Sequence, residues 1–327
     1  MKQYIDLQCV TITSAWKTLH SNLYELPKSS LDIARLRKNG CVAQNFAITM
    51  LPLPLKTRMG DIFPEDDYFI NKCHGIFMET LTMHGDEVAY AGNAAEMLEN
   101  ERQGKLSAFL SLSDGRAVGG DFKKIRKFHK MGIRMMGLTW NLPNCFGSPA
   151  SADPKHMAQG LTKFGKNAVE YMNELGMIID VSHLSDKGFW DVASLSKKPF
   201  VASHSNARAL SPHPRNLSDF MIKGVADSGG VVGVNFYPPF LCEDTTQMET
   251  TMDRVVDHIK HIIDKGGIEC VAIGSDFDNY DTPTPVADVT QMPLFFETLE
   301  KAGLTEQEIE NIAYNNMFRV IQKSMKS

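Results

Sequence analysis

Two histidines stand at the ends of two short apolar runs near the middle of the chain. His183 ends the run 177–183, and His204 ends the run 199–204. Each run is too short for a core helix and lacks polar alternation, which is typical of a buried parallel strand. Because the carboxyl ends of parallel strands meet at one barrel mouth or one sheet edge, we expect both imidazoles to face one cavity. Imidazole is the commonest metal ligand, so the pair favours a metal site.

Further polar residues end other predicted strands or follow them. Asp276 ends the run 270–276, and an acid at the end of a barrel strand is more often functional than a helix cap. Arg215 could be an ordinary loop arginine, or it could clamp a substrate carboxylate through its forked guanidinium. We expect Trp140 to lie half in the core and half in the pocket wall. The remaining predicted strand ends are Gln8, Ser113 and Asn235.

Two other kinds of site receive little support from the sequence. A Ser-His-Asp arrangement would require Ser113, one of the two histidines and Asp276 to meet in space, and no spacing in the sequence tests this. The glycine pairs of the chain lack GxGxxG or Walker spacing, so nucleotide binding is not indicated.

The elements that would position these residues alternate along the chain. Eight apolar runs cover residues 4–11, 41–50, 106–113, 133–140, 177–183, 199–204, 231–237 and 270–276. Helical patterns separate them, and a strongly helical tail covers 292–324. The pattern predicts an α/β fold, namely a (β/α)8 TIM barrel with C-terminal helices, built as a single domain over residues 1–327. An open doubly wound sheet is the alternative, because strand count alone does not show closure.

The composition is that of an ordinary globular protein. A formal net charge of −5 and a pI near 6.1 give no electrostatic basis for nucleic-acid binding, and the basic run 123–130 is typical of a solvated helix face. No run approaches about 18 apolar residues, so we expect no membrane contact. The six cysteines are scattered without CxxC spacing, which favours reduced thiols. We therefore expect a soluble, cytoplasmic protein.

Four motifs resemble those of a known family. They are DVSH at 180–183, SHSNA at 203–207, HPRNLSD at 213–219 and IGSDFD at 273–278. Four separate motifs in the right order make the resemblance specific, and it extends over nearly the whole chain. On these residues the chain is similar to the membrane (renal) dipeptidase family, a family of zinc-dependent peptidases.

The resemblance implies a metal-dependent (β/α)8 hydrolase that cleaves dipeptides, often with a D-residue at the carboxyl side. Two zinc ions in such enzymes share a bridging carboxylate and activate a bridging water. By resemblance, His183 and His204 would bind one zinc and Asp276 would assist proton transfer. Arg215, with Asn216 beside it, would hold the substrate's terminal carboxylate, and Trp140 would contact the substrate. A homodimer is also implied by the resemblance alone.

Three positions depart from the family pattern. The first strand should supply a histidine and an aspartate, but it carries Gln8 and Val10, and the bridging glutamate is replaced by Ser113. Val is no ligand, Gln is a poor one for zinc, and a neutral hydroxyl cannot bridge two cations. Asp114 follows Ser113 and would point to the opposite face of the strand. Three of five expected ligands are absent, so we expect at most one zinc ion, or none.

These departures leave several hypotheses open. One is a dipeptidase whose activity is lost or strongly altered. Another is a metal-free pseudoenzyme, or an engineered scaffold, with a rebuilt pocket that binds a small molecule. A third is a metal-independent catalyst that uses His183, His204 or Asp276 as a general base. The scaffold motifs are intact while the replaced ligands are uncharged, and Asn279 stands where relatives often have glycine, which fits a rebuilt pocket.

Overall fold

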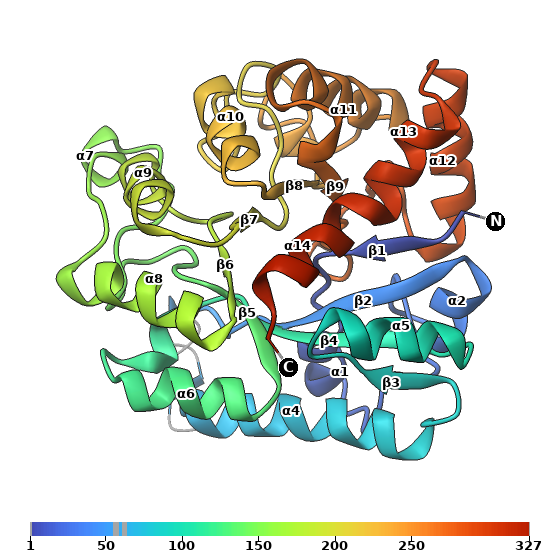
Figure 1. The fold of residues 1–327 in the computed structure, drawn as a ribbon, viewed down its shortest axis with the longest axis horizontal. Coiled ribbons are helices and arrows are strands. Elements are labelled where there is room, and N and C mark those ends of the chain that lie inside the picture. Colours follow the sequence, from blue (N-terminus) through green and yellow to red (C-terminus); the bar gives the residue numbers. More distant parts are fainter. Residues whose placement is uncertain (1, 55–58, 61–63, 327) are drawn as a thin grey trace.

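The structure, a computed structural model, describes residues 2–54, 59–60 and 64–326 (Figure 1). Eight parallel strands form a ring: β1 (Tyr4–Asp6), β2 (Cys41–Ile48), β4 (Leu106–Leu112), β5 (Ile133–Gly137), β6 (Ile178–Asp180), β7 (Val201–Ala202), β8 (Val231–Val234) and β9 (Val271–Ile273). β1 pairs with both β2 and β9, and β2 pairs with β4, so the ring closes. The predicted (β/α)8 barrel is confirmed, and the open sheet is excluded.

Helices surround the strands (Figure 1). They are α1 (Thr11–Lys17), α2 (Ile33–Lys38), α4 (Asp66–Met83), α5 (Ala94–Arg102), α6 (Phe122–Lys130), α7 (Pro154–Met157), α8 (Lys163–Leu175), α9 (Asp186–Leu195), α10 (Asp219–Asp227), α11 (Met252–Gly266), α12 (Met292–Lys301), α13 (Glu306–Glu310) and α14 (Asn316–Ser324). Thr162, Ser185 and Ser218 begin α8, α9 and α10, because each side chain accepts a hydrogen bond from a free backbone N–H of the first turn. These caps set where each helix leaves the barrel mouth.

One strand was not predicted from the sequence. Residues 66–101, a long amphipathic stretch of the sequence between the second and third apolar runs, form α4, the short strand β3 (Val88–Tyr90) and most of α5. β3 lies outside the ring and pairs only with the first residues of β4. The segment after β3 ends at Asn93, because the Asn93 side chain caps α5 by accepting a hydrogen bond from the Glu96 N–H.

The regular strands are shorter than the apolar runs that predicted them. β1 ends at Asp6, not at residue 11. Beyond Asp6 the chain stays hydrogen-bonded to β9 and the residues after it: the Leu7 N–H donates to the Ile273 carbonyl, and the Val10 N–H donates to the Phe277 carbonyl. Helix α1 then starts at Thr11. The last residues of each run therefore leave the regular ladder and form the barrel mouth, where polar side chains collect.

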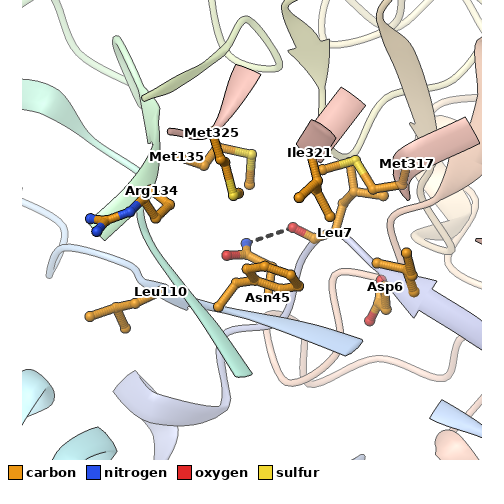
Figure 2. A pocket seen from close by; sticks show the side chains of 11 residues that line it. Asp6, Leu7, Asn45, Leu110, Arg134, Met135, Met317, Ile321 and Met325 are labelled. Carbon is orange, nitrogen blue, oxygen red and sulfur yellow. Dashed lines mark hydrogen bonds between the residues drawn. The ribbon is translucent and has the colours of Figure 1, made fainter. Parts of the chain in front are cut away.

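The amino end of the barrel is closed by the C-terminal helix. Figure 2 shows Met317 and Ile321 of α14 on the side of Leu7, and Met325, which follows the helix, beside Met135. Their spacing of four residues places them on one helix face. Asn45 lines this region together with Asp6 and Arg134, and its Nδ2 donates to the Leu7 carbonyl at 2.6 Å. This apolar closure leaves the carboxyl end as the open mouth.

Two glycines inside helices form a matched pair for a stability test. A Cβ at Gly75 in α4 would meet no atom within 4 Å, whereas a Cβ at Gly165 in α8 would lie 2.1 Å from the Phe146 carbonyl oxygen. We expect Gly75→Ala to raise the free energy of unfolding by about 1 kcal/mol, because glycine loses more backbone entropy in a helix. Gly165→Ala should lower it by about 1–3 kcal/mol through overpacking. Urea denaturation measures the free energy of unfolding of both variants. An equal change in the two variants would contradict the close packing of Gly165 in α8 against the Phe146 carbonyl.

Two global features complete the fold. Within the described ranges, no helix is long and apolar enough to cross a membrane. All six cysteines are free thiols, and five of them are buried.

Candidate active site

The open mouth of the barrel contains a cavity of about 410 Å³. Its wall comes from the segments that follow the strands and is made of Val10, Thr13, Lys17, Thr49, Met50, Leu51, Pro52, Trp140, Asn141, His183, His213, Arg215, Tyr237, Phe240, Asp278, Asn279 and Tyr280. The volume falls within the usual range for small-molecule sites, about 300–1,000 Å³. Aromatic rings and a few polar groups share the wall, which suits an organic ligand with a charged end.

The two histidines meet, but only His183 lines the cavity, and His204 is buried beside it. The Nε2 atoms of His183 and His204 lie 3.0 Å apart, from the ends of β6 and β7. Burial lowers the pKa of both rings, and the Arg215 guanidinium lowers the pKa of His183 further. Both imidazoles are therefore neutral near pH 7, so each has one nitrogen with a free lone pair.

A buried carboxylate fixes the orientation of His204. Asp180, at the end of β6, accepts hydrogen bonds from the backbone N–H and the hydroxyl of both Ser182 and Ser203, at 2.6–3.0 Å. Because the Ser203 hydroxyl donates its only proton to Asp180, it can only accept from His204 Nδ1, which lies 2.7 Å away. His204 Nε2 is then the unprotonated nitrogen, and it points toward His183.

An equivalent arrangement occurs across the barrel. Asp6, at the end of β1, accepts from the backbone N–H of Ser275 at 2.9 Å and from its hydroxyl at 2.6 Å, and also from Gln44 Nε2. Burial raises the pKa of Asp6 to about 6, although these hydrogen bonds oppose the shift. The contact holds the start of the segment that carries Asp276.

Asp276 lies in the barrel mouth in a strained conformation. Its φ is 59°, a left-handed value that is uncommon for a residue other than glycine. Its Oδ2 accepts from Asn235 Nδ2 at 3.1 Å, Asn279 Nδ2 at 3.0 Å and the Tyr280 hydroxyl at 2.6 Å. Its Oδ1 is buried without a hydrogen-bond partner among the described residues. Three donors thus hold one oxygen of this carboxylate, and the other oxygen is enclosed behind the cavity wall.

Arg215 is buried next to the histidines. One Nη donates to the His204 carbonyl at 3.2 Å and the other lies 3.5 Å from Ser205 Oγ, while the guanidinium sits 5.5 Å from the centre of the Phe240 ring. Its Nε has no partner, and no carboxylate lies within ion-pair distance, as far as the described part of the chain goes. Burial lowers the pKa of Arg215, but a guanidinium keeps its charge in proteins. A buried, poorly paired cation is a strong attractor for an anionic group.

The opposite side of the mouth is neutral. Gln8 Nε2 lies 3.4 Å from Ser113 Oγ, which is 3.1 Å from Thr49 Oγ1. Of this group only Thr49 lines the cavity, together with the apolar side chain of Val10, whereas Gln8 and Ser113 are buried. Asp114 points elsewhere, as expected, and accepts from the Arg116 N–H and from an asparagine. Across the described residues, no three side chains of His, Cys, Asp or Glu are grouped so that they could hold a metal ion.

Of the other residues that the sequence suggested for the site, Trp140 lines the cavity and Asn216 does not. Trp140 is in the cavity wall, with its ring 6.3 Å from that of His183. Asn216, expected to contact substrate, is fully buried, and its amide donates to the carbonyls of Ser211 and Phe240. This geometry gives Asn216 a structural role in the loop. Ser113 has no base among its hydrogen-bond partners, so the geometry does not support a Ser-His-Asp arrangement.

The sequence did not indicate several residues of the wall. Tyr280 and Tyr237 stack at 3.7 Å between ring centroids, and the Tyr280 hydroxyl binds Asp276. Burial, followed by the charge of Asp276, raises the pKa of Tyr280 well above its usual value. Lys17 was also missed, because no residue of the helical region that follows the first strand was assigned to the site. The spacing of Val10, Thr13 and Lys17 is the signal that could have found it.

A closed (β/α)8 barrel with imidazoles, an arginine and an acid at its carboxyl mouth is a common scaffold of hydrolases. A family model described as membrane dipeptidase (peptidase family M19) matches residues 2–326. The chain belongs to the membrane dipeptidase family, whose activity is the metal-dependent hydrolysis of dipeptides.

Individual relatives agree with this assignment. An uncharacterized protein from the pqqA 5′ region of Klebsiella pneumoniae is 37% identical over 237 residues, which cover 70% of this chain and 86% of that protein. An uncharacterized dipeptidase of Schizosaccharomyces pombe is 34% identical over 68% of this chain, which spans only 54% of that protein. A crystal structure of a metallopeptidase from Rhodobacter sphaeroides, bound to a phosphinate mimic of the dipeptide L-Ala-D-Ala, is 27% identical with a TM-score of 0.86, over 99% of both chains.

Proposed function

We propose that this protein binds a small carboxylate of the dipeptide class in the barrel mouth, and that it does not carry out the two-zinc hydrolysis of its family. The observation that carries the proposal is the neutral cluster of Gln8, Ser113 and Thr49, which is joined by contacts of 3.1–3.4 Å and reaches the cavity through Thr49. In the family pattern, positions 8 and 113 supply metal ligands. Here they contact each other and a threonine, so these side chains are paired without a cation.

The donor set does not fit a pair of zinc ions. Zinc binds thiolate, imidazole and carboxylate, and its catalytic sites use three protein ligands together with water. Of the family positions, only His183 and His204 remain as such donors, besides Asp276, whose Oδ2 already accepts three hydrogen bonds. Val10 cannot coordinate, and the Gln8 amide and Ser113 hydroxyl are neutral. We infer that the chemistry of a bridging, metal-activated water is absent.

The cationic side of the mouth supports a carboxylate ligand. Arg215 is buried, has a free Nε and lies beside the aromatic ring of Phe240. A carboxylate that reached this guanidinium would form a charge-assisted hydrogen bond away from bulk water, which is stronger than a neutral one. The dipeptide mimic bound to the Rhodobacter sphaeroides relative supports a ligand of that size.

A single zinc ion is the second candidate. The two histidine Nε2 atoms lie 3.0 Å apart, close enough for both to bind one ion if each presents a lone pair. This alternative predicts one ion per chain and a weak, metal-dependent hydrolysis. It would need a third donor, for which Asp276 is the nearest family residue.

Metal analysis combined with ligand titration tests the proposal. After dialysis against metal-free buffer, we expect well under one zinc ion per chain, together with saturable binding of L-Ala-D-Ala by calorimetry and no release of free alanine. One zinc ion per chain with slow hydrolysis would favour the second candidate. Two zinc ions with rapid hydrolysis would overturn the proposal, because they would require ligands other than those at 8, 10 and 113.

The cellular location and the partners of this protein are proposed from the sequence. The proposal includes a cytoplasmic location, which the scattered free cysteines favour. The absence of a nucleic-acid or membrane partner, and the homodimer implied by the family resemblance, stay predictions.

A further inference from the structure

Helix α1 contributes one face to the cavity wall. Val10, at the N-cap position, is followed by Thr13 and Lys17, and spacings of three and four residues place all three on one side of the helix. The Thr13 hydroxyl is already used, since it donates to the Thr49 carbonyl at 3.0 Å and accepts from the Thr49 N–H at 3.1 Å. Of these three side chains, only Lys17 therefore has a polar group that is available to a ligand.

The Lys17 side chain is exposed at the end of α1, on the rim of the cavity. No aspartate or glutamate lies within 4.0 Å of its ammonium group in the parts of the chain that the structure describes. A solvated lysine on a helix end would normally need no explanation. This one borders the same cavity as the buried Arg215, so the cavity has a cation at its base and another at its rim.

As far as the structure describes the chain, no acidic group forms an ion pair with these cations, although the charges of Asp276 and Asp180 favour the protonated form of Arg215. Among the described residues, Asp278 is the only acid in the cavity wall, and its two oxygens accept from the Thr11 hydroxyl and the Ser30 N–H, both at 2.6 Å. Asp276 lies deeper and is held by its three donors. A ligand that enters the mouth therefore meets two cations with free N–H groups, separated by the largely apolar wall that includes Met50 and Leu51.

We propose that Lys17 binds a second anionic group of the ligand, so that the cavity selects compounds with two acidic groups. The first would be the carboxylate at Arg215. The second would be an acidic group at the opposite end, such as the side-chain carboxylate of an acidic N-terminal residue in a dipeptide. This inference rests on the proposed function, because it takes the carboxylate at Arg215 as given. Lys17 is then a residue that determines specificity through the charge of the ligand.

Two isosteric dipeptides test the role of Lys17. L-Glu-D-Ala and L-Gln-D-Ala differ by one charge at the end remote from Arg215. We expect the protein to bind L-Glu-D-Ala about five-fold more tightly, the size of one partly solvated ion pair. Lys17→Met should abolish this preference and Lys17→Arg should keep it, when Kd is measured by calorimetry at low salt. Raising the ionic strength should reduce the preference in the unaltered protein, because salt screens exposed charges.

Lys130→Met is the matched control. Lys130 is exposed at the end of α6, on the side of the barrel where β5 begins, opposite the cavity. This variant should keep the preference for L-Glu-D-Ala. Equal binding of both peptides by the unaltered protein would refute the role of Lys17 and leave the proposed function standing. Failure of both peptides to bind would instead refute the proposed function, and the inference with it.

Discussion

A variant with Gln8→His, Val10→Asp and Ser113→Glu should bind two zinc ions per chain and hydrolyse L-Ala-D-Ala, whereas the parent protein should do neither. The three changes supply one imidazole and two carboxylates, the ligand types that zinc prefers. Positions 8 and 113 are already in contact at 3.4 Å, and His183 and His204 lie across the same mouth. Position 10 is the N-cap of α1 and has no side-chain cap, so an aspartate there also suits the helix.

Metal content and thermal stability report on this variant without relying on activity. Added zinc should raise its Tm, because an ion that binds only the folded state stabilises that state, by about 2.7 kcal/mol at one hundred times Kd. The same variant with His204→Ala should bind less zinc and lose the hydrolysis. A folded triple variant with no zinc and no shift in Tm would show that the metal positions assigned by family resemblance are wrong.

The strand pattern was predictable because each barrel strand is a buried apolar run. Closure was not, since β1 meets β9 through a single residue pair, Asp6 with Ile273, and no local pattern encodes the stagger that brings them together. β3 was missed for a related reason. Its 3 residues lie in a long amphipathic region and gain their partners only from β4. The bounds of α6, by contrast, agree with the sequence pattern because an aspartate cap and a following glycine mark its ends.

The histidine pair was predictable because β6 and β7 are neighbours both in sequence and in the barrel. The contact between Gln8 and Ser113 was harder to foresee, since β2 lies between their strands and only the curvature of the barrel brings the side chains together. Tyr280 was missed because Asp276 and Asp278 both adopt left-handed backbone conformations without a glycine to signal them. The resulting turn returns Tyr280 to the Asp276 carboxylate.

The proposed absence of a metal pair is compatible with the stability of both sides of the mouth. An unpaired buried carboxylate is costly, so removing zinc alone would leave positions 10 and 113 destabilising if they were still acidic. Neutral side chains at both positions remove that penalty. On the other side, His204 stays oriented by Asp180 through Ser203, without help from a metal. The orientation of His204 and the proposed carboxylate site at Arg215 therefore do not depend on a bound metal.

Arg215→Met should weaken binding of L-Ala-D-Ala by at least about 30-fold and leave the free energy of unfolding unchanged or higher. Truncating one partner of a buried charged hydrogen bond costs about 2–5 kcal/mol of binding. The protein itself gains little from Arg215, since its contacts to His204 and Ser205 are 3.2 and 3.5 Å long. With no carboxylate partner among the described residues, the cost of burying this cation is poorly offset.

Arg208→Met provides the contrasting control. Both Nη atoms of Arg208 donate to the Asp186 carboxylate at 2.7 Å, and its Nε donates to the Asn216 carbonyl, so this arginine ties the loop to α9 outside the cavity wall. We expect this variant to lose about 1 kcal/mol of stability and to keep its affinity for the dipeptide. Calorimetry should therefore show the larger loss of affinity in Arg215→Met, and urea denaturation should show the larger loss of stability in Arg208→Met. If Arg215→Met lost stability while retaining affinity, the carboxylate would bind elsewhere and Arg215 would serve the fold.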